Sequence, residues 1–261
     1  MPKRITFFSK NRTNAFLEGC EADEVFGPRI ATVFRAQSFA PPVDYYVEEA
    51  RGQVMGVMAR FYGTVYIVSS TDDASFFLPT LARSSAWVAL EGREKVIRPM
   101  AQYLGIENIE TSYCMRHDGE TFPDLSGFDV RKSENLRRFY EFLSLCHDGF
   151  ADGTNYKLWY EDYAARIGSG LTELYFLYDK DTPVACATLN VQSKSAAVLG
   201  SVSTPPEFRG KGYGRAVSAF VTERIHSLGL TATLQCSHDS LRDFYAPLGY
   251  RETFKWAIAE R

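Results

Sequence analysis

Three glycines and two flanking arginines occur together in the sequence Thr204-Pro205-Pro206-Glu207-Phe208-Arg209-Gly210-Lys211-Gly212-Tyr213-Gly214-Arg215. Residues 196–203 before this run are predicted to form a strand, and the residues after it, up to Leu228, carry apolar side chains at helical spacing. The first N–H groups of a helix lack backbone partners and lie at the positive end of the helix dipole, so they attract anions. Because glycine has no side chain, a phosphate can approach the backbone closely. We therefore expect this turn to bind a cofactor that carries a pyrophosphate.

Other kinds of glycine-rich turn fit this run less well, although such a turn alone is a weak signal. A Rossmann turn has the spacing G-x-G-x-x-G after the first strand of a parallel unit. Residues 210–214 instead read G-K-G-Y-G and follow an apparent antiparallel meander. A Walker loop needs GxxxxGK followed by Ser or Thr, which the run lacks. A purely structural surface turn, with glycines at positive φ, is the alternative to an anion site.

The composition is that of a globular chain and argues against several classes of protein. The 261 residues allow one large domain or two modest ones, and 45% of them are hydrophobic and 23% charged. A formal net charge of −3 gives no broad basic field for nucleic acid or for an anionic membrane. No apolar run is long enough to span a bilayer, and no apolar segment follows the basic residues near Met1. We therefore expect neither a membrane span nor a signal peptide.

The cysteine and histidine residues are scattered along the chain. The five cysteines form no CxxC pair, and the four histidines are equally dispersed, so no spacing typical of metal ligands occurs. We expect five reduced thiols in a cytoplasmic protein that has no metal site. These residues are Cys20, Cys114, Cys146, Cys186 and Cys236, with His117, His147, His226 and His238.

A polar segment with Gly and Pro, residues 116–127, is the best candidate for a linker, and we place a domain boundary near residue 126. In the C-terminal half, the patterns predict two helices separated by a loop, then a meander, the glycine turn with its long helix, and a final strand–helix–strand unit. The expected strands cover residues 128–132, 172–178, 184–191, 196–203, 231–236 and 250–259. The expected helices cover residues 135–146, 157–167, the segment up to 228 and residues 240–246, and residues 147–154 form the loop. The apolar stripe of the long helix is Val217, Phe220, Val221, Ile225 and Leu228.

The N-terminal half shows a weaker version of the same order. No glycine occurs between Gly63 and Gly92, in the region that corresponds to the glycine turn. We interpret this half as a degenerate duplicate of the other, and an unrelated α+β region is the alternative. The expected helices cover residues 14–24, 27–37 and 93–103, with another after residue 77, and the expected strands cover residues 45–49, 53–60, 64–69 and 86–90.

The residues Arg209-Gly210-Lys211-Gly212-Tyr213-Gly214 resemble the R/Q-x-x-G-x-G/A acyl-CoA signature of the GNAT N-acetyltransferases. Their context of strand, proline, glycine turn and long helix is similar too, and residues 202–206 are similar to the V-Y-T-P-P lead-in of a predicted bacterial subgroup. The resemblance covers residues 128–261. It implies an α+β fold of two GNAT-like domains, each a mostly antiparallel twisted sheet flanked by helices. These would be a degenerate domain at residues 1–125, without the acyl-CoA motif, and a catalytic domain at residues 126–261.

The resemblance also implies that acetyl-CoA is the acyl donor and that no metal is needed. The backbone of the glycine turn would hold the pyrophosphate, with charge-assisted contacts from Arg209 and Lys211. The edge of the strand at residues 202–204 would pair with the pantetheine arm where this strand separates from the next. A backbone N–H of Val202 or Thr204 would polarise the thioester carbonyl. The implied cofactor-binding residues are Val202, Ser203, Thr204, Arg209, Gly210, Lys211, Gly212, Tyr213, Gly214, Arg215 and His238.

Residues 244–250, F-Y-A-P-L-G-Y, resemble the L-Y-x-x-x-G-F ending of the family. Many members carry a tyrosine near the CoA sulfur at the position of Tyr245, where a phenol can protonate the departing thiolate as a general acid. The alternative is that Tyr245 packs its ring and donates one hydrogen bond. The sequence departs from the family pattern at His238 and Leu241, where Asn and Ala are common, which leaves the local detail and the acyl-donor preference open.

The acceptor side carries no single clear signal. A base or a water relay must remove a proton from the attacking amine, and Glu173, Asp148 and His147 are the candidates for this base. A peptide, an amino acid, a polyamine or an antibiotic amine would all fit as acceptor, and the mild acidity slightly favours a small cationic amine. Three aromatic residues are expected either to line an acceptor pocket or to pack in the core: Trp159, Tyr156 and Tyr160.

Three functions are compatible with these patterns. The first is an acetyl-CoA-dependent N-acetyltransferase for a small-molecule or peptide amine, as a monomer or homodimer, with no nucleic acid or membrane partner. The second is a non-catalytic acyl-CoA-binding or regulatory protein, against which Tyr245 argues. The third is an aminoacyl-tRNA-dependent transferase, which would need a basic channel that a net charge of −3 does not favour.

Overall fold

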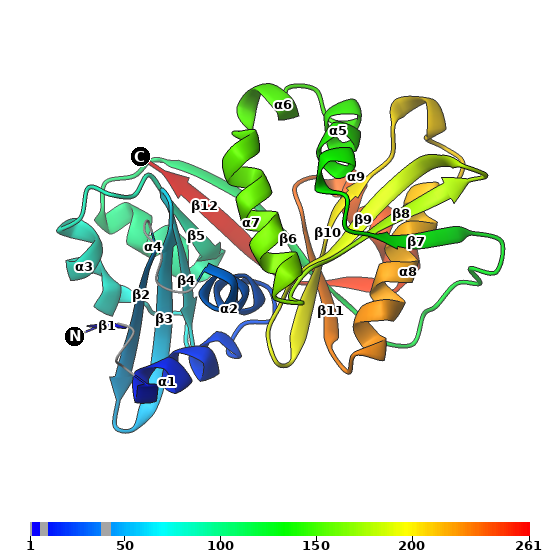
Figure 1. Cartoon of the computed structure of the whole chain (residues 1–261). Helices are drawn as coiled ribbons and strands as arrows, with labels where there is room; N and C mark the ends of the chain where they lie inside the picture. Colours follow the sequence, from blue (N-terminus) through cyan, green and yellow to red (C-terminus); the bar gives the residue numbers. More distant parts are fainter. Residues whose placement is uncertain (1, 6–9, 38–42) are drawn as a thin grey trace.

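The computed structural model describes residues 2–5, 10–37 and 43–261, and every strand within these residues belongs to one sheet (Figure 1). From one edge to the other, its strands are β1 (Lys3–Arg4), β2 (Val43–Ala50), β3 (Gln53–Phe61), β4 (Thr64–Ser69), β5 (Ala89–Arg93), β12 (Tyr250–Glu260), β6 (Asn108–His117), β11 (Thr231–Cys236), β10 (Ala196–Ser203), β9 (Thr182–Gln192), β8 (Glu173–Asp179) and β7 (Asp129–Ser133). The pairs β4–β5 and β10–β11 are parallel and the other neighbours are antiparallel. The expected fold class, a mixed and mostly antiparallel sheet with helices, is confirmed.

Helices cover both faces of this sheet. One face carries α1, α2, α5 and α7, and the other carries α3, α4, α8 and α9, because the side chains of each strand alternate between the two faces. The helices are α1 (Lys10–Cys20), α2 (Phe26–Gln37), α3 (Leu78–Ala82), α4 (Glu94–Tyr103), α5 (Leu136–Cys146), α6 (Phe150–Gly153), α7 (Tyr156–Gly168), α8 (Tyr213–Ser227) and α9 (Asp239–Tyr245).

The two halves of the chain repeat one order of elements. The half from β1 to β6 and the half from β7 to β12 each run through a strand, two main helices, a three-stranded meander, a helix, a strand, a helix and a strand. The one parallel pair of each half, β4–β5 or β10–β11, stands at the same place in this order. The duplication expected from the sequence is therefore present in the structure.

The last strand of each half lies next to the other half. β12 pairs with β5 of the first half, and β6 pairs with β11 of the second, while β6 and β12 pair with each other at the centre of the sheet. Figure 1 shows β12, in red, crossing into the part of the molecule that holds α3 and α4. The predicted boundary near residue 126 falls between β6 and β7 and stays a prediction.

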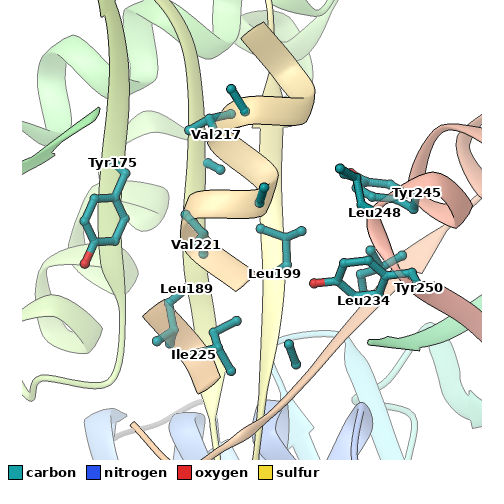
Figure 2. Close-up of a cluster of buried hydrophobic side chains, with 14 of the residues drawn as sticks. Tyr175, Leu189, Leu199, Val217, Val221, Ile225, Leu234, Tyr245, Leu248 and Tyr250 are labelled. Carbon is teal, nitrogen blue, oxygen red and sulfur yellow. The ribbon is translucent and has the colours of Figure 1, made fainter. Parts of the chain in front are cut away.

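The long helix α8 packs its apolar stripe onto the second half of the sheet. Val217, Val221 and Ile225 are buried, and Figure 2 shows them along α8 together with Leu189 and Leu199 of the sheet. The stripe ends earlier than expected, because α8 stops at Ser227 and Leu228, in the cap position, is 41% exposed. Packing of this stripe fixes the direction in which the N-terminus of α8 points.

Several sequence-based expectations for single elements are wrong. Residues 108–117 were not predicted as a strand, yet β6 lies at the centre of the sheet, between β12 and β11 of the second half. The expected loop at residues 147–154 contains the short helix α6. The helix expected at residues 14–24 ends at Cys20. The buried carboxylate of Asp23 then accepts hydrogen bonds from Val25 N and Phe26 N, both at 2.8 Å, where α2 begins.

Candidate active site

Strands β10 and β11 part from each other midway along β10. Their parallel pairing covers only residues 196–198 of β10 and 231–233 of β11. Beyond that, Ser201 has a positive φ of 50°, which is rare for a residue with a side chain, and the β9–β10 register shifts between Gly200 and Ser203. This bulge turns the end of β10 away from β11, as the gap expected from the sequence requires.

The glycine turn leads from β10 to the N-terminus of α8. Gly210 and Gly212 have φ values of 78° and 82°, in the left-handed region that favours glycine, and Gly212 is the N-cap residue of α8. A Cβ on either residue would meet no atom within 4 Å, whereas a Cβ on Gly214 would lie 3.2 Å from Thr204 Oγ1. The first backbone bond of α8 runs from Ala216 N to Gly212 O at 3.0 Å. The backbone N–H groups of residues 213–215 therefore have no hydrogen-bond acceptor within the helix, and such groups can bind an anion.

Arg209 holds the glycine turn in place. Its Nε donates to the carbonyl oxygen of Thr204 at 3.0 Å, and its Nη2 donates to the carbonyl oxygen of Cys146 at 3.2 Å. The guanidinium therefore ties the turn to the end of β10 and to the end of α5. Two of its donors are engaged with the backbone, so part of its role is to position the turn.

A cavity of about 540 Å³ lies where the turn, the end of β10 and α9 meet. Ten of the predicted site residues line this cavity. The glycine turn, the edge of β10 and Tyr245 therefore all border the same cavity. These ten residues are Val202, Ser203, Thr204, Arg209, Gly210, Gly212, Tyr213, Gly214, Arg215 and Tyr245.

Two predicted site residues do not line this cavity. The Nζ of Lys211 lies 5.5 Å from the ring centre of Phe208, which is itself a lining residue. His238 precedes α9 and lines a second, polar pocket of about 260 Å³ with Tyr113 and Lys255. Their assignment to cofactor binding stays a prediction.

Tyr245 lies in the apolar cluster under α8 and is 7% exposed. Figure 2 shows it next to Leu248, and its ring packs edge-on against Phe244 and Tyr250 at centroid distances of 4.8 and 5.8 Å. Burial raises the pKa of Tyr245, so its phenol keeps its proton at neutral pH. Its phenol hydrogen-bonds with the Ser218 side chain, and the residue lines the cavity; its role as a proton donor stays a prediction.

His147 is the one candidate base that the structure brings into the cavity among the three that we considered. Its Nε2 lies 2.8 Å from Ser203 Oγ, and both residues line the cavity. Burial and the nearby Arg209 guanidinium lower the pKa of His147, so the imidazole is neutral at neutral pH. Asp148, the next residue, is exposed and does not line the cavity.

The expectation that Glu173 is a base is wrong. Its carboxylate accepts hydrogen bonds from Arg224, Lys132 and Tyr175, away from the cavity. These donors, Arg224 foremost, lower the pKa of Glu173 to about 2, so it does not take up protons at neutral pH.

The three aromatic candidates for an acceptor pocket lie along α7 and do not line the cavity. Trp159 packs against Phe139 and Tyr163, with ring centroids at 5.6 and 4.6 Å, in the cluster between α5 and α7. Tyr156 and Tyr160 are exposed. The alternative of core packing therefore holds for Trp159.

Sequence reasoning missed several residues that line the cavity. Cys146 lies at its wall, but burial raises the pKa of its thiol to about 11, so it is not a thiolate. Phe208 and Phe244 supply apolar surface, and their positions beside Arg209 and Tyr245 in the sequence were the only signal available. Cys146 gave no signal, because it reaches the cavity from a different helix.

The described residues contain neither a metal-binding cluster nor a membrane-spanning helix. Within residues 2–5, 10–37 and 43–261, no group of three or more His, Cys, Asp or Glu side chains is arranged to hold a metal ion. In the same part of the chain no helix has the length and apolar character to cross a bilayer. All five cysteines lie within the described residues. Each is buried, and none of them forms a disulfide.

The family model of the acetyltransferase (GNAT) family matches residues 136–250, from α5 to the start of β12. This segment belongs to the GNAT family. It contains the separated end of β10, the glycine turn and Tyr245, so the family match and the cavity coincide. No curated protein sequence matches the chain significantly.

Solved structures match the chain over its whole length. A GNAT acetyltransferase from Colwellia psychrerythraea has a TM-score of 0.62 at 16% identity, covering 100% of this chain and 99% of that one. A tandem GNAT protein from the clavulanic acid biosynthesis pathway has a TM-score of 0.64 at 13% identity, with 100% and 98% coverage. A GNAT N-acetyltransferase from Sphaerobacter thermophilus gives 0.60 at 15% identity, with 100% and 95% coverage. At these identities the matches show the fold, and that fold is the tandem GNAT arrangement.

Proposed function

We propose that the protein is an acetyl-CoA-dependent N-acetyltransferase that acts on an amine of a small molecule or peptide. The observation that carries this proposal is the single cavity at which the glycine turn, the separated end of β10 and Tyr245 meet. One end of this cavity is suited to an anion and the other to an acyl group.

The residues present fit coenzyme A. Gly210 and Gly212 line the cavity next to the α8 N-terminus, and without side chains they leave room for a phosphate beside the backbone amides. Arg215, on the first turn of α8, lines the same space and adds a positive charge. The end of β10 has no pairing with β11 beyond Val198, so its backbone is available to an extended arm.

The chemistry needs one proton donor and one proton acceptor from the chain. Acetyl-CoA, when bound, supplies the acetyl group as a thioester. Tyr245 is placed to protonate the sulfur as it leaves, because its buried phenol keeps a proton at neutral pH and lines the cavity. The backbone at Val202 to Thr204 would polarise the thioester carbonyl.

We assign one active site to each chain. The first half repeats the fold, but the segment after β4 has no glycine between Gly63 and Gly92 and therefore lacks the turn that holds the anion. We propose that residues 1–125 form this inactive repeat and residues 126–261 the catalytic one, with β6 and β12 exchanged between them.

Calorimetric titration with acetyl-CoA tests the binding site. Gly212→Glu places a carboxylate at the anion end of the cavity, and we expect at least about tenfold weaker binding. Gly105→Glu is a matched control, because Gly105 has a similar φ of 71° with no atom near its Cβ position and lies after α4 in the other half. Equal affinity in the wild-type protein and both variants would contradict the assignment.

A screen of amines with acetyl-CoA, followed by free-thiol release, tests the activity. We expect release that depends on both acetyl-CoA and an amine. Tight acetyl-CoA binding without release for any amine would instead support a non-catalytic acyl-CoA-binding protein.

A further inference from the structure

The cavity is reached from both faces of the sheet. Tyr245 belongs to the cluster under α8, on one face. Ser203 lies opposite Cys186 in the β9–β10 register, and Cys186 packs in the cluster under α5 and α7, on the other face. His147 follows α5 and reaches Ser203 from that second face. The proton donor and the His147–Ser203 pair therefore stand on opposite sides of the end of β10.

The pair is held firmly. His147 is the C-cap residue of α5, and its backbone N–H donates to Leu143 O at 3.0 Å. Ser203 is 4% exposed, at the end of β10. The 2.8 Å contact between Nε2 and Oγ therefore links two positions that the backbone fixes independently.

The surroundings of His147 favour its neutral form. The charged group that acts on it is the Arg209 guanidinium from the glycine turn, while α5 presents the Cys146 thiol and β10 the Ser203 hydroxyl. Burial, with a smaller contribution from Glu207, raises the pKa of the Cys146 thiol, which keeps that thiol protonated. A neutral imidazole with its proton on Nδ1 leaves Nε2 free to accept the Ser203 hydroxyl hydrogen.

We propose that Ser203 and His147 form the proton relay that deprotonates the acceptor amine. This inference rests on the proposed acetyltransferase function and assigns the base for that reaction. The amine nitrogen forms a C–N bond with the thioester carbonyl carbon, and the C–S bond breaks. The amine proton passes to Ser203 Oγ while the Ser203 hydroxyl proton passes to His147 Nε2, and Tyr245 gives its proton to the thiolate. Water returns a proton to Tyr245 and takes one from His147, so the net products are an amide and a thiol.

Kinetics with the amine of highest thiol release in the screen tests the relay. General base catalysis contributes about 10²–10⁴-fold, so we expect His147→Gln to lower kcat by about that factor and to leave the calorimetric affinity for acetyl-CoA unchanged. The acid limb of the kcat/KM–pH profile should disappear in this variant. Ser203→Ala should lower kcat and keep the limb, because the imidazole is still present. His226→Gln is the control, since His226 is a half-buried histidine outside the cavity whose pKa is also lowered, and it should retain wild-type kcat.

Histidine NMR on the protein alone gives a second readout that does not need an amine. We expect the His147 ring, assigned by its loss in His147→Gln, to carry its proton on Nδ1 at pH 7.5 and to titrate below the usual histidine pKa. A proton on Nε2, or a charged ring at pH 7.5, would overturn the relay whether or not the protein turns over.

Two other results would also overturn it. An unchanged kcat in His147→Gln would show that His147 is not the base. An acetyl group found on Ser203 by mass spectrometry after rapid quenching would show that Ser203 acts as a nucleophile. Absence of any amine-dependent thiol release in the wild-type protein would count against the proposed function itself, and the NMR result would then decide the state of the pair.

Discussion

Arg224 donates two hydrogen bonds to Glu173, from Nε to Oε2 at 2.9 Å and from Nη2 to Oε1 at 3.0 Å. Lys132 and Tyr175 add bonds of 2.9 and 2.6 Å to the same carboxylate. The four residues come from α8, β8 and β7, so this cluster ties the long helix to the edge of the sheet. Its role is structural.

The Glu173 cluster predicts a pH-dependent contribution to stability. The pKa of Glu173 is lowered to about 2, against about 4.3 in the unfolded chain. A depressed carboxylate pKa stabilises the fold above the unfolded value, and this stabilisation is lost as the pH falls from about 4.3 to about 2.

We therefore expect Glu173→Gln to lower the free energy of unfolding by on the order of 1 kcal/mol at pH 7, and by less at pH 3, as measured by urea unfolding. Glu141→Gln is the control, because Glu141 forms only an exposed pair with Arg137 and should change little. Equal effects of Glu173→Gln at both pH values would contradict this account.

The contact between His117 and His226 predicts a loss of stability in the same direction of pH, but in a higher pH range. His117 Nδ1 lies 3.0 Å from His226 Nε2, and burial and His117 lower the pKa of His226. A lowered histidine pKa means that the unfolded chain binds more protons between the folded value and about 6.5, so stability falls as the pH drops through that window.

Thermal unfolding between pH 8 and pH 5 measures this effect. We expect the wild-type midpoint to fall over that range, and the fall to be smaller in His226→Gln. The same slope in both proteins would show that other groups cause it.

A side chain at position 27 is expected to destabilise the first half of the protein by a steric clash. A Cβ at this position would lie 1.8 Å from the carbonyl oxygen of Cys20, so α1 and α2 approach here too closely for any side chain. We expect Gly27→Ala to destabilise the protein by about 1–3 kcal/mol, measured by urea unfolding. Gly168→Ala, in α7 with no atom near its Cβ position, should be neutral or stabilising. A neutral Gly27→Ala would mean that the two helices shift without cost.

Replacement of Tyr245 is expected to lower turnover without weakening the binding of acetyl-CoA. If its phenol protonates the thiolate, Tyr245→Phe should lower thiol release by about 10²–10⁴-fold and leave acetyl-CoA affinity unchanged in calorimetry. Tyr103→Phe, in the other half at an exposed position, should behave as wild type. Wild-type release by Tyr245→Phe would support the alternative that the ring only packs.

Local features of the sequence predicted much of the candidate site. The left-handed conformations of Gly210 and Gly212 depend on the glycines themselves, and the helix after them depends on an apolar stripe within one segment. Strand β6 was missed for the opposite reason. Its residues are largely polar, and it forms a strand because β11 and β12 provide partners on both sides.

The sequence by itself determined the glycine turn and the main elements of the second half, because backbone preference and periodicity act over neighbouring residues. Only the tertiary structure decided which candidate base reaches the cavity. His147 and Ser203 are 56 residues apart and meet because α5 packs over β10, whereas Glu173 is drawn to Arg224 on α8. Which side chains meet depends on how distant elements pack against each other. The spacing of residues within one segment carries no information about that packing.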